Sequence, residues 1–268
     1  IDRTRNLQSF QTYDTPQKAM EATAHKYHRD LWAPQGQRIE VWIEKDAAIG
    51  VVEGVCSANS VPYFSCRGYT SMSEMHEAAQ RLRWHIEQGN EVTILHIGDH
   101  DPSGIDMSRD IEDRLRSFIG RDWAGLHLGK GSWTRGQIRA SMNERIEEVR
   151  ERKGIKTETT GVPWRVKRIA LNYEQVMEYD PPPNPAKTTD ARFAKYREET
   201  GLDESWELDA LDPSVLSNLI QREVDAVRDD DLWDEYERQM DREREVLTGV
   251  GNWWDDVATF INQKGGRA

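Results

Sequence analysis

The sequence predicts an α/β fold: a parallel sheet flanked by helices, with a helical C-terminal extension. Over the first 120 residues, short apolar runs alternate with segments of helical periodicity, which is typical of a doubly wound, Rossmann-like layer. One run, EVTILHIGD at 91–99, is almost continuously apolar before its final charge, as expected of a strand covered on both faces. Residues 229–268 are helical in pattern and acidic, which gives the C-terminal extension.

The expected elements of this N-terminal part follow one another in chain order. They are a helix over 15–32, a strand over 39–43, a helix over 46–58, a strand over 61–66, a helix over 71–89, the strand over 91–99 and a helix over 102–118. The third helix is the clearest, because Met75, Leu82 and Ile86 recur at helical spacing. Ser103 is expected to cap the helix after the third strand, with Asp106 as its partner in a capping box.

Beyond residue 120 the expected elements are more polar. They are a charged helix over 135–154, a strand over 163–171, an irregular proline-rich segment over 180–192, a strand-like segment over 205–211, a helix over 212–229 and an acidic helix over 229–247, with residues 251–261 docking at its end. The resulting domains are a helical lead-in over 1–35, a sheet domain over 36–228 with a basic insertion over about 130–165, and an acidic helical tail over 229–268.

The formal net charge of −12 argues against a protein that coats nucleic acid without sequence preference. The charge is uneven, however. Residues 130–168 hold eleven Lys and Arg against five Asp and Glu, whereas residues 198–256 hold five against twenty. The basic segment can meet a phosphate backbone locally, and the acidic one favours a protein partner through the C-terminal helix. The plainer alternative for both segments is a solvated helical face.

No apolar run of about 18 residues predicts a membrane span, and the first residues carry no signal peptide. Because the chain begins at Ile1 rather than Met, we expect a fragment or a processed form. The two cysteines, Cys56 and Cys66, form neither a C-x-x-C pair nor a disulfide framework. Both are expected to be buried apolar side chains in a reducing, cytoplasmic protein.

Carboxylates follow the first and third expected strands, at the point where each strand ends. Glu44 comes after the first, and Asp99 and Asp101 come after the third. Ligands collect at the carboxyl ends of parallel strands. If the two strands are neighbours, the three charges meet, and each close pair repels by about 4 kcal/mol at an effective dielectric of about 20. A proton or a hard cation offsets this repulsion, and oxygen-only ligands favour Mg²⁺ or Mn²⁺.

Plainer interpretations stand beside this one. Asp99 or Asp101 can satisfy N–H groups of the following helix instead of binding an ion. His100 lies between them, and its side chain is expected to point away, either with a structural role or as a donor to a metal ligand.

Two stretches, VWIEKDA at 41–47 and GDHDPSGID at 98–106, together resemble the Toprim domain. This fold is shared by topoisomerases, bacterial primases, recombination-repair proteins and overcoming-lysogenization-type nucleases. More narrowly, they are similar to the A subunit of type IIB topoisomerases and its meiotic double-strand-break relatives. CRGYTS at 66–71 is similar to a Gly-Tyr stretch of the same proteins, and WELDAL at 206–211 resembles a later acidic stretch.

The resemblance covers residues 38–120 and, more loosely, 163–228, and it implies metal-dependent DNA cleavage. Glu44, Asp99 and Asp101 would be both catalytic and metal-binding, with Glu44 alternatively a general acid or base toward the 3′ oxygen. The candidate phosphate and DNA contacts are Lys45, Arg67, Arg135, Arg139, Lys167 and Arg168, and the further acidic candidates are Glu207 and Asp209.

The chain departs from the family in its nucleophile. Type IIB enzymes cleave DNA with a tyrosine on a winged-helix domain that precedes the Toprim domain, in a motif with an Arg shortly before paired tyrosines. Tyr13 and Tyr27, which precede Glu44, have no such context, and no winged helix fits into residues 1–35. We therefore expect either a tyrosine domain upstream of Ile1 or hydrolysis by metal-activated water.

Two other function classes stay open, as does a homodimer. A DNA-binding or regulatory module would keep the acidic site while chemistry happens elsewhere. A haloacid-dehalogenase-like phosphatase also places Asp-x-Asp after a buried strand. There, however, a Gly-Thr or similar pattern should follow the second Asp, where Pro102 and Ser103 stand, and Glu44 would have no role.

Overall fold

The computed structural model describes residues 10–66, 68–155 and 161–265. Arg67, a candidate phosphate contact, lies outside the described residues. The chain forms two compact units: Trp32–Arg228, and Ile1–Leu31 together with Asp229–Ala268. The lead-in and the acidic tail, expected as separate segments, thus belong to a single unit.

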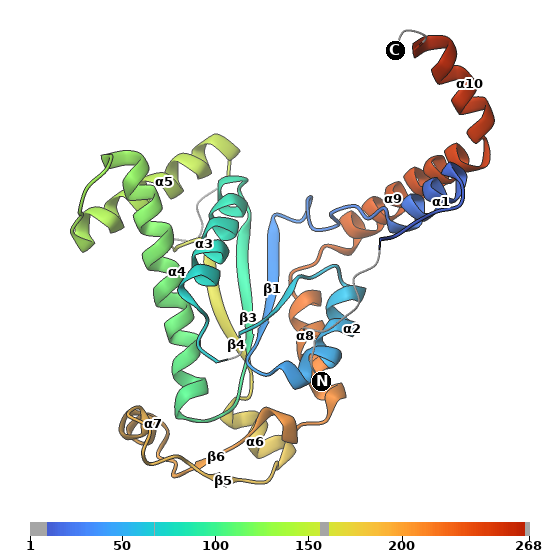
Figure 1. The fold of residues 1–268 in the computed structure, drawn as a ribbon. Helices are drawn as coiled ribbons and strands as arrows, with labels where there is room; N and C mark the ends of the chain where they lie inside the picture. Colours follow the sequence, from blue (N-terminus) through green and yellow to red (C-terminus); the bar gives the residue numbers. More distant parts are fainter. Residues whose placement is uncertain (1–9, 67, 156–160, 266–268) are drawn as a thin grey trace. The chain divides into compact units, whose positions relative to one another are not determined.

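The larger unit is built on a four-stranded parallel sheet with the order β2-β1-β3-β4 (Figure 1). Its strands are β1 (Gln37–Ile43), β2 (Tyr63–Ser65), β3 (Glu91–Ile97) and β4 (Trp164–Ala170). The prediction of a parallel sheet flanked by helices is confirmed. β1 and β3 pair along their whole length, with Ile43 opposite Ile97. Both strands therefore end at the same place on the sheet edge.

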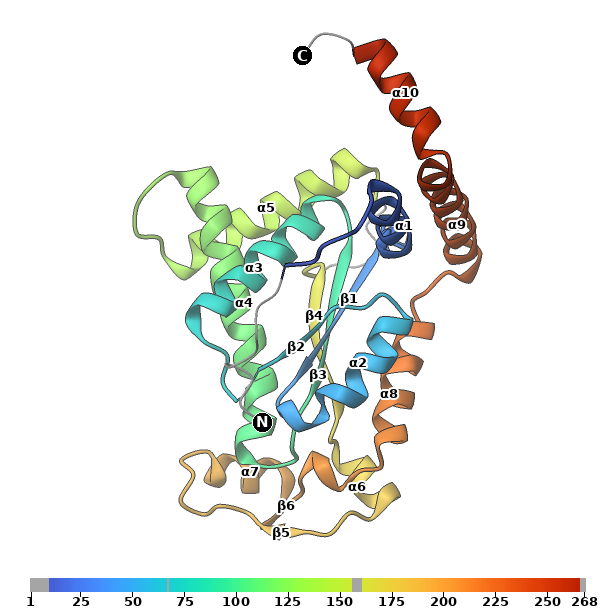
Figure 2. The same cartoon turned by 45° about the vertical axis from the view of Figure 1, so that its right-hand side comes forward.

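Helices cover both faces of this sheet (Figure 2). On one face α2 (Ile49–Ala58), preceded by the 3-10 turn η1 (Asp46–Ala48), packs with α8 (Pro213–Asp225). On the other face α3 (Met72–Glu87) packs with α4 (Pro102–Leu128), and α5 (Arg135–Lys153) packs against α4. α4 is longer than predicted, because the buried side chains of Ile119 and Trp123 continue its apolar face past residue 118.

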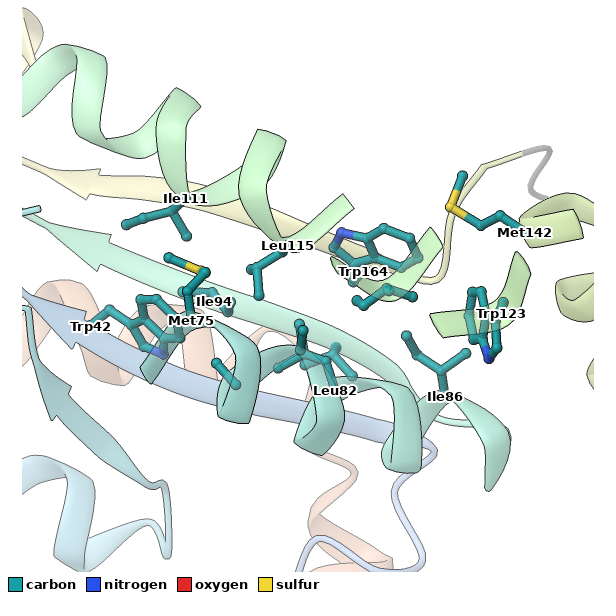
Figure 3. Packing of buried hydrophobic residues seen from close by; sticks show 14 of the residues in the cluster. Trp42, Met75, Leu82, Ile86, Ile94, Ile111, Leu115, Trp123, Met142 and Trp164 are labelled. Atoms are coloured by element: carbon teal, nitrogen blue, oxygen red, sulfur yellow. The ribbon is translucent and has the colours of Figure 1, made fainter. Parts of the chain in front are cut away.

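The main core lies between the sheet and the α3–α4 layer (Figure 3). Trp42 and Ile94 of the sheet meet Met75 and Leu82 of α3 and Leu115 of α4, and each is at most 1 % exposed. Truncating a fully buried leucine to alanine costs about 2–5 kcal/mol. This layer therefore holds α4 firmly on the sheet and fixes its N-terminus at the carboxyl ends of the strands.

Residues 172–211, here called the strap, lie beyond the carboxyl ends of the strands (Figures 1 and 2). The strap contains α6 (Tyr173–Tyr179), β5 (Asn184–Pro185), α7 (Phe193–Thr200), β6 (Glu204–Ser205) and the 3-10 turn η2 (Leu208–Ala210). β5 and β6 pair antiparallel as a separate two-stranded sheet. The two short helices were not predicted, whereas the proline-rich stretch between them is largely irregular, as expected.

In the smaller unit, α1 (Pro16–Lys26) packs along α9 (Asp230–Asn252). Tyr27 donates to a carboxylate oxygen of Glu243 at 2.5 Å, and Arg29 pairs with the other oxygen at 2.5 Å. The last helix is α10 (Trp254–Gly265). The prediction that residues 251–261 dock onto the preceding helix is wrong for α10, because none of its residues is buried.

Both cysteines are free and buried, as predicted. Burial raises the pKa of the Cys56 thiol and that of the Cys66 thiol to about 12. None of the helices in the described part of the chain has the length and apolarity that a bilayer crossing requires.

Candidate functional site

The ends of β1 and β3 bring Glu44 and Asp99 into contact. The backbone N–H of Glu44 donates to the carbonyl of Ile97 at 2.9 Å, which extends the ladder one residue past β1. The backbone N–H of Asp99 then donates to Oε2 of Glu44 at 3.1 Å. Two residues 55 positions apart therefore meet at one point of the sheet edge, because the parallel register carries them there.

Gly98 leaves the space that the Glu44 carboxylate occupies. A Cβ atom on Gly98 would lie 2.7 Å from Oε2 of Glu44, which is closer than nonbonded atoms approach. The backbone of Gly98 is held from the other side as well: its N–H donates to the carbonyl of Ala170 at 2.9 Å, and its carbonyl accepts from Leu171 at 2.7 Å. Because the backbone of Gly98 is held in this way, a side chain at position 98 would have to displace the Glu44 carboxylate.

Asp101 is the N-cap of α4, and Pro102 fills the first turn. Oδ1 of Asp101 accepts a hydrogen bond from the N–H of Gly104 at 2.6 Å and another from the hydroxyl of Ser103 at 3.0 Å. The prediction that Ser103 caps this helix is therefore wrong: Pro102 is already its first residue, so Asp101 and not Ser103 is the N-cap. Within the described residues, Oδ2 of Asp101 has a hydrogen bond only with the Ser103 hydroxyl, at 3.2 Å.

The strap closes over the Asp-x-Asp turn. The backbones of His100 and Trp206 exchange two hydrogen bonds, of 2.8 and 3.0 Å. This pairing places the N–H of Leu208 2.7 Å from Oδ1 of Asp99. The His100 ring is buried and lies edge-on to the rings of Tyr196 and Trp206, so its role is structural.

Lys45 inserts an ammonium group among further carboxylates. Its Nζ lies 3.2 Å from Oδ1 of Asp99, 2.9 Å from Oε2 of Glu207 and 3.4 Å from Oδ2 of Asp209. Glu207 and Asp209, which only the family resemblance linked to the site, thus lie at its rim. The ammonium neutralises part of the negative charge that accumulates at this edge.

Arg168 supports the turn from within, whereas a surface contact to a ligand was predicted. Its guanidinium donates to three backbone carbonyls of the turn from Gly98 to Gly104, at 2.9, 2.5 and 2.8 Å. Lys167 is on the other side of β4 and pairs with Glu223 of α8 at 2.5 Å. Successive residues of a strand point to opposite faces, which explains the different surroundings of these two neighbours.

Burial and crowded charge act on the pKa values of these groups. Burial, followed by the charge of Asp99, holds the pKa of Glu44 above its usual value. Burial also raises the pKa of Asp99, although the Leu208 N–H and the Lys45 ammonium oppose it. Burial lowers the pKa of Arg168 to about 10, against the attraction of the nearby carboxylates. Carboxyl groups with raised pKa values are incompletely compensated, so this edge favours an additional cation or proton.

The possible metal ligands at this edge are carboxylate oxygens, and they do not form a closed cage. Carboxylate oxygens are the ligands that Mg²⁺ and Mn²⁺ prefer, and Mg²⁺ typically takes one or two of them and retains waters for a phosphate. Across the described residues, the one group of His, Cys, Asp and Glu whose ligand atoms all lie within 4.8 Å of one another is elsewhere, at His127, Glu144 and Glu148. The carboxylates of the sheet edge are more open than that group.

Arg135 and Arg139 lie on α5 and line a cleft between α5 and α4. The structure does not bring them to the acidic edge, which is formed at the opposite end of α4 by Asp101.

A further contact at this edge was not predicted. The hydroxyl of Tyr69 donates to Oδ2 of Asp106 at 2.9 Å, and Arg192 of the strap donates to the same oxygen at 3.2 Å. The guanidinium of Arg192 also lies 4.7 Å from the centroid of the Tyr69 ring. Asp106, predicted as a capping partner, instead ties the loop after β2 and the strap to α4. No local pattern signals such a contact between three distant segments.

Comparison with known proteins adds no further assignment. No protein family, curated protein or solved structure matches the chain.

Proposed function

We propose that the chain is a Toprim-type protein that takes part in DNA cleavage dependent on Mg²⁺ or Mn²⁺. It acts either as a nuclease or as the metal-binding half of a topoisomerase-like transesterase. The observation that carries the proposal is the 3.1 Å hydrogen bond from the Asp99 N–H to the Glu44 carboxylate, next to the Asp101 cap of α4. It joins the two halves of the acidic pattern at one edge of the sheet.

The residues have separate roles in this proposal. Asp99 and Asp101 would hold the ion through their carboxylate oxygens. A bound ion would neutralise the scissile phosphate and stabilise the leaving oxygen. Glu44, whose pKa is raised by burial and by Asp99, binds beside them or passes a proton to the 3′ oxygen. Arg168 keeps the turn in shape through its hydrogen bonds to backbone carbonyls.

The N-terminus of α4 and Lys45 assist with the substrate. The first turn of α4 carries a partial positive charge that attracts a phosphate. Lys45 contacts three carboxylates and has a flexible stem, so it can turn toward a phosphate oxygen when DNA binds.

A second candidate function is a DNA-binding or regulatory module without its own catalysis. The position of Lys45 favours it, because the ammonium already contacts Asp99, where a catalytic ion would bind. In that case DNA binds, but no phosphodiester is broken by this chain.

Plasmid nicking separates these functions. We expect the full chain to nick supercoiled DNA with Mg²⁺ or Mn²⁺ and to lose about 100-fold in rate in Glu44→Gln and in Asp101→Asn. Asparagine at 101 keeps an oxygen acceptor for the Gly104 N–H. Glu151→Gln removes an exposed carboxylate of α5 that lies neither at the edge nor in the cleft between α4 and α5, and it should nick normally.

Each outcome of this experiment selects one class. A covalent protein–DNA product identifies a transesterase. A mobility shift without nicking supports the regulatory module. Hydrolysis of a small phosphate ester, with no effect on DNA, supports a haloacid-dehalogenase-like phosphatase. Equal nicking by all three variants would rule out chemistry at Glu44 and Asp101.

A further inference from the structure

A cleft of about 1170 Å³ lies between α4 and α5, and arginine dominates its lining. Arg116 and Arg121 come from α4, and Arg135, Arg139 and Arg150 come from α5. Two carboxylates also line it, so five arginines less two carboxylates leave a charge of +3 in a chain whose net charge is −12. This concentration of positive charge runs against the composition of the whole chain.

Three of the five guanidiniums are available to a ligand. Arg116 and Arg150 each pair with a glutamate of their own helix, at 2.8 and 2.7 Å. The side chains of Arg121, Arg135 and Arg139, by contrast, have no hydrogen bond or ion pair within the described part of the chain. All three are exposed. Unpaired like charges around one cleft repel one another, and a bound anion offsets that electrostatic repulsion.

We propose that this cleft binds the phosphate backbone of duplex DNA, as a contact region distinct from the acidic edge. Guanidinium groups bind phosphate with two parallel hydrogen bonds. Arg135 and Arg139 lie one turn apart on the same face of α5, so both can follow one strand, while Arg121 faces them from α4. The cleft also exceeds the usual small-molecule pocket of about 300–1000 Å³, which favours an extended ligand over a free nucleotide.

α4 sets the distance between the cleft and the acidic edge. Asp101 caps this helix, and Arg121, the available arginine of α4, follows 20 residues later. At a rise of about 1.5 Å per residue, the two are about 30 Å apart. B-DNA advances about 3.4 Å per base pair, so a duplex needs about 9 base pairs to reach both. This length requirement rests on the proposed cleavage function, whereas binding in the cleft does not.

Binding is measured with the full chain and a fluorescent duplex of about 20 base pairs, without divalent metal, as a function of salt. We expect Arg135→Ala/Arg139→Ala to weaken binding at least about tenfold and to make the slope of log K against log salt shallower by about 2. Arg197→Ala/Arg222→Ala is the matched control. It also removes two exposed arginines, both outside the cleft, and should leave affinity and slope nearly unchanged.

Each other result overturns the assignment. Equal losses of duplex affinity in the two double variants would mean that the effect depends only on net charge and not on the cleft. Absence of duplex binding, or tight binding of a nucleoside triphosphate but not of duplex, would make the cleft something other than a DNA groove. A nicking assay of Asp101→Asn and of Arg135→Ala/Arg139→Ala separates the two proposals. If Asp101→Asn no longer nicks but still binds duplex, the cleft assignment stands. If Arg135→Ala/Arg139→Ala binds and nicks like the original protein, only the cleavage function stands.

Discussion

The carboxylate of Asp99 accepts a 2.7 Å hydrogen bond from the backbone N–H of Leu208, 109 residues further along the chain. The bond forms because the neighbouring residue, His100, pairs with Trp206. It fastens the strap to the end of β3 and gives the acidic edge its third segment of chain. The edge is thus assembled from residues 44–45, 98–104 and 206–209.

Replacing Gly98 with alanine should displace the Glu44 carboxylate, because the new Cβ would lie 2.7 Å from Oε2. We expect a loss of stability of about 1–3 kcal/mol in chemical denaturation, together with loss of metal-dependent nicking. Gly50→Ala in α2 is the control, since a Cβ there meets nothing within 4 Å, and it should be neutral or stabilise by up to about 1 kcal/mol. Identical behaviour of the two variants would contradict the packing of Glu44 on Gly98.

Replacing Lys45 with alanine should strengthen Mg²⁺ binding, because its ammonium no longer competes for Asp99. Thermal denaturation at increasing Mg²⁺ measures this, since an ion at about 100 times its Kd stabilises the folded state by about 2.7 kcal/mol. The midpoint of the Tm increase should move to a lower Mg²⁺ concentration in Lys45→Ala. Lys195→Ala, an exposed position on α7, serves as control. A Mg²⁺ response no different from that of the control would count against Asp99 as a ligand.

Replacing Arg168 with lysine should destabilise the larger unit by about 2–4 kcal/mol, because an ammonium cannot span the backbone carbonyls that the guanidinium binds. Arg165→Lys, an exposed position on the same strand with a single 3.1 Å bond to Thr93, should stay within about 0.5 kcal/mol of the original protein. Urea denaturation compares the two. If Arg168→Lys keeps full stability and loses only DNA affinity, Arg168 acts at the surface, as the sequence predicted.

Stability should also depend on pH through His96, which is fully buried in β3. Burial, assisted by the charge of Arg168, lowers the pKa of His96 to about 3. An unfolded histidine has a pKa of about 6.5, so below that pH the unfolded chain binds a proton that the folded chain does not. The stability that neutral His96 contributes is therefore fully present above about pH 6.5 and is lost as the pH falls toward 3. At pH 5 the free energy of unfolding is lower by about 2 kcal/mol.

The His96 effect is isolated by comparing the original protein with His96→Gln in urea at about pH 7.5 and pH 5. The carboxyls of the acidic edge titrate in both proteins, so their contribution cancels. The glutamine variant should lose about 2 kcal/mol less between the two pH values. An equal loss in both proteins would mean that His96 is protonated in the folded state.

Local patterns in the sequence predict the sheet and its acidic edge, because those features depend on short-range order. β3 is visible as a continuous apolar run, and the charges that end β1 and β3 mark the carboxyl ends of the strands. The helices α6 and α7 have only 7 and 8 residues, about two turns each, which is too short for an apolar stripe to stand out in the sequence. Ser103 and Asp101 are equally good caps by type, and only the start of the helix at Pro102 decides between them.

No local pattern in the sequence predicts the long-range contacts at the site. Arg168 resembles any exposed strand cation in sequence, and its burial depends on α4 lying against that face of β4. The pairing of His100 with Trp206 joins segments over a hundred residues apart, which no periodicity encodes. For the same reason Glu207 and Asp209 were connected to the edge only through the family resemblance.

Titration of the full chain with Mn²⁺, followed by electron paramagnetic resonance of the free ion, tests most directly whether the acidic edge holds a divalent metal. We predict that the original protein binds Mn²⁺ and that Asp101→Asn weakens binding on the order of tenfold or more. His127→Ala, which disrupts the separate cluster with Glu144 and Glu148, should bind like the original protein. Binding that survives in Asp101→Asn and disappears in His127→Ala would contradict a metal site at the edge formed by Glu44 and Asp99.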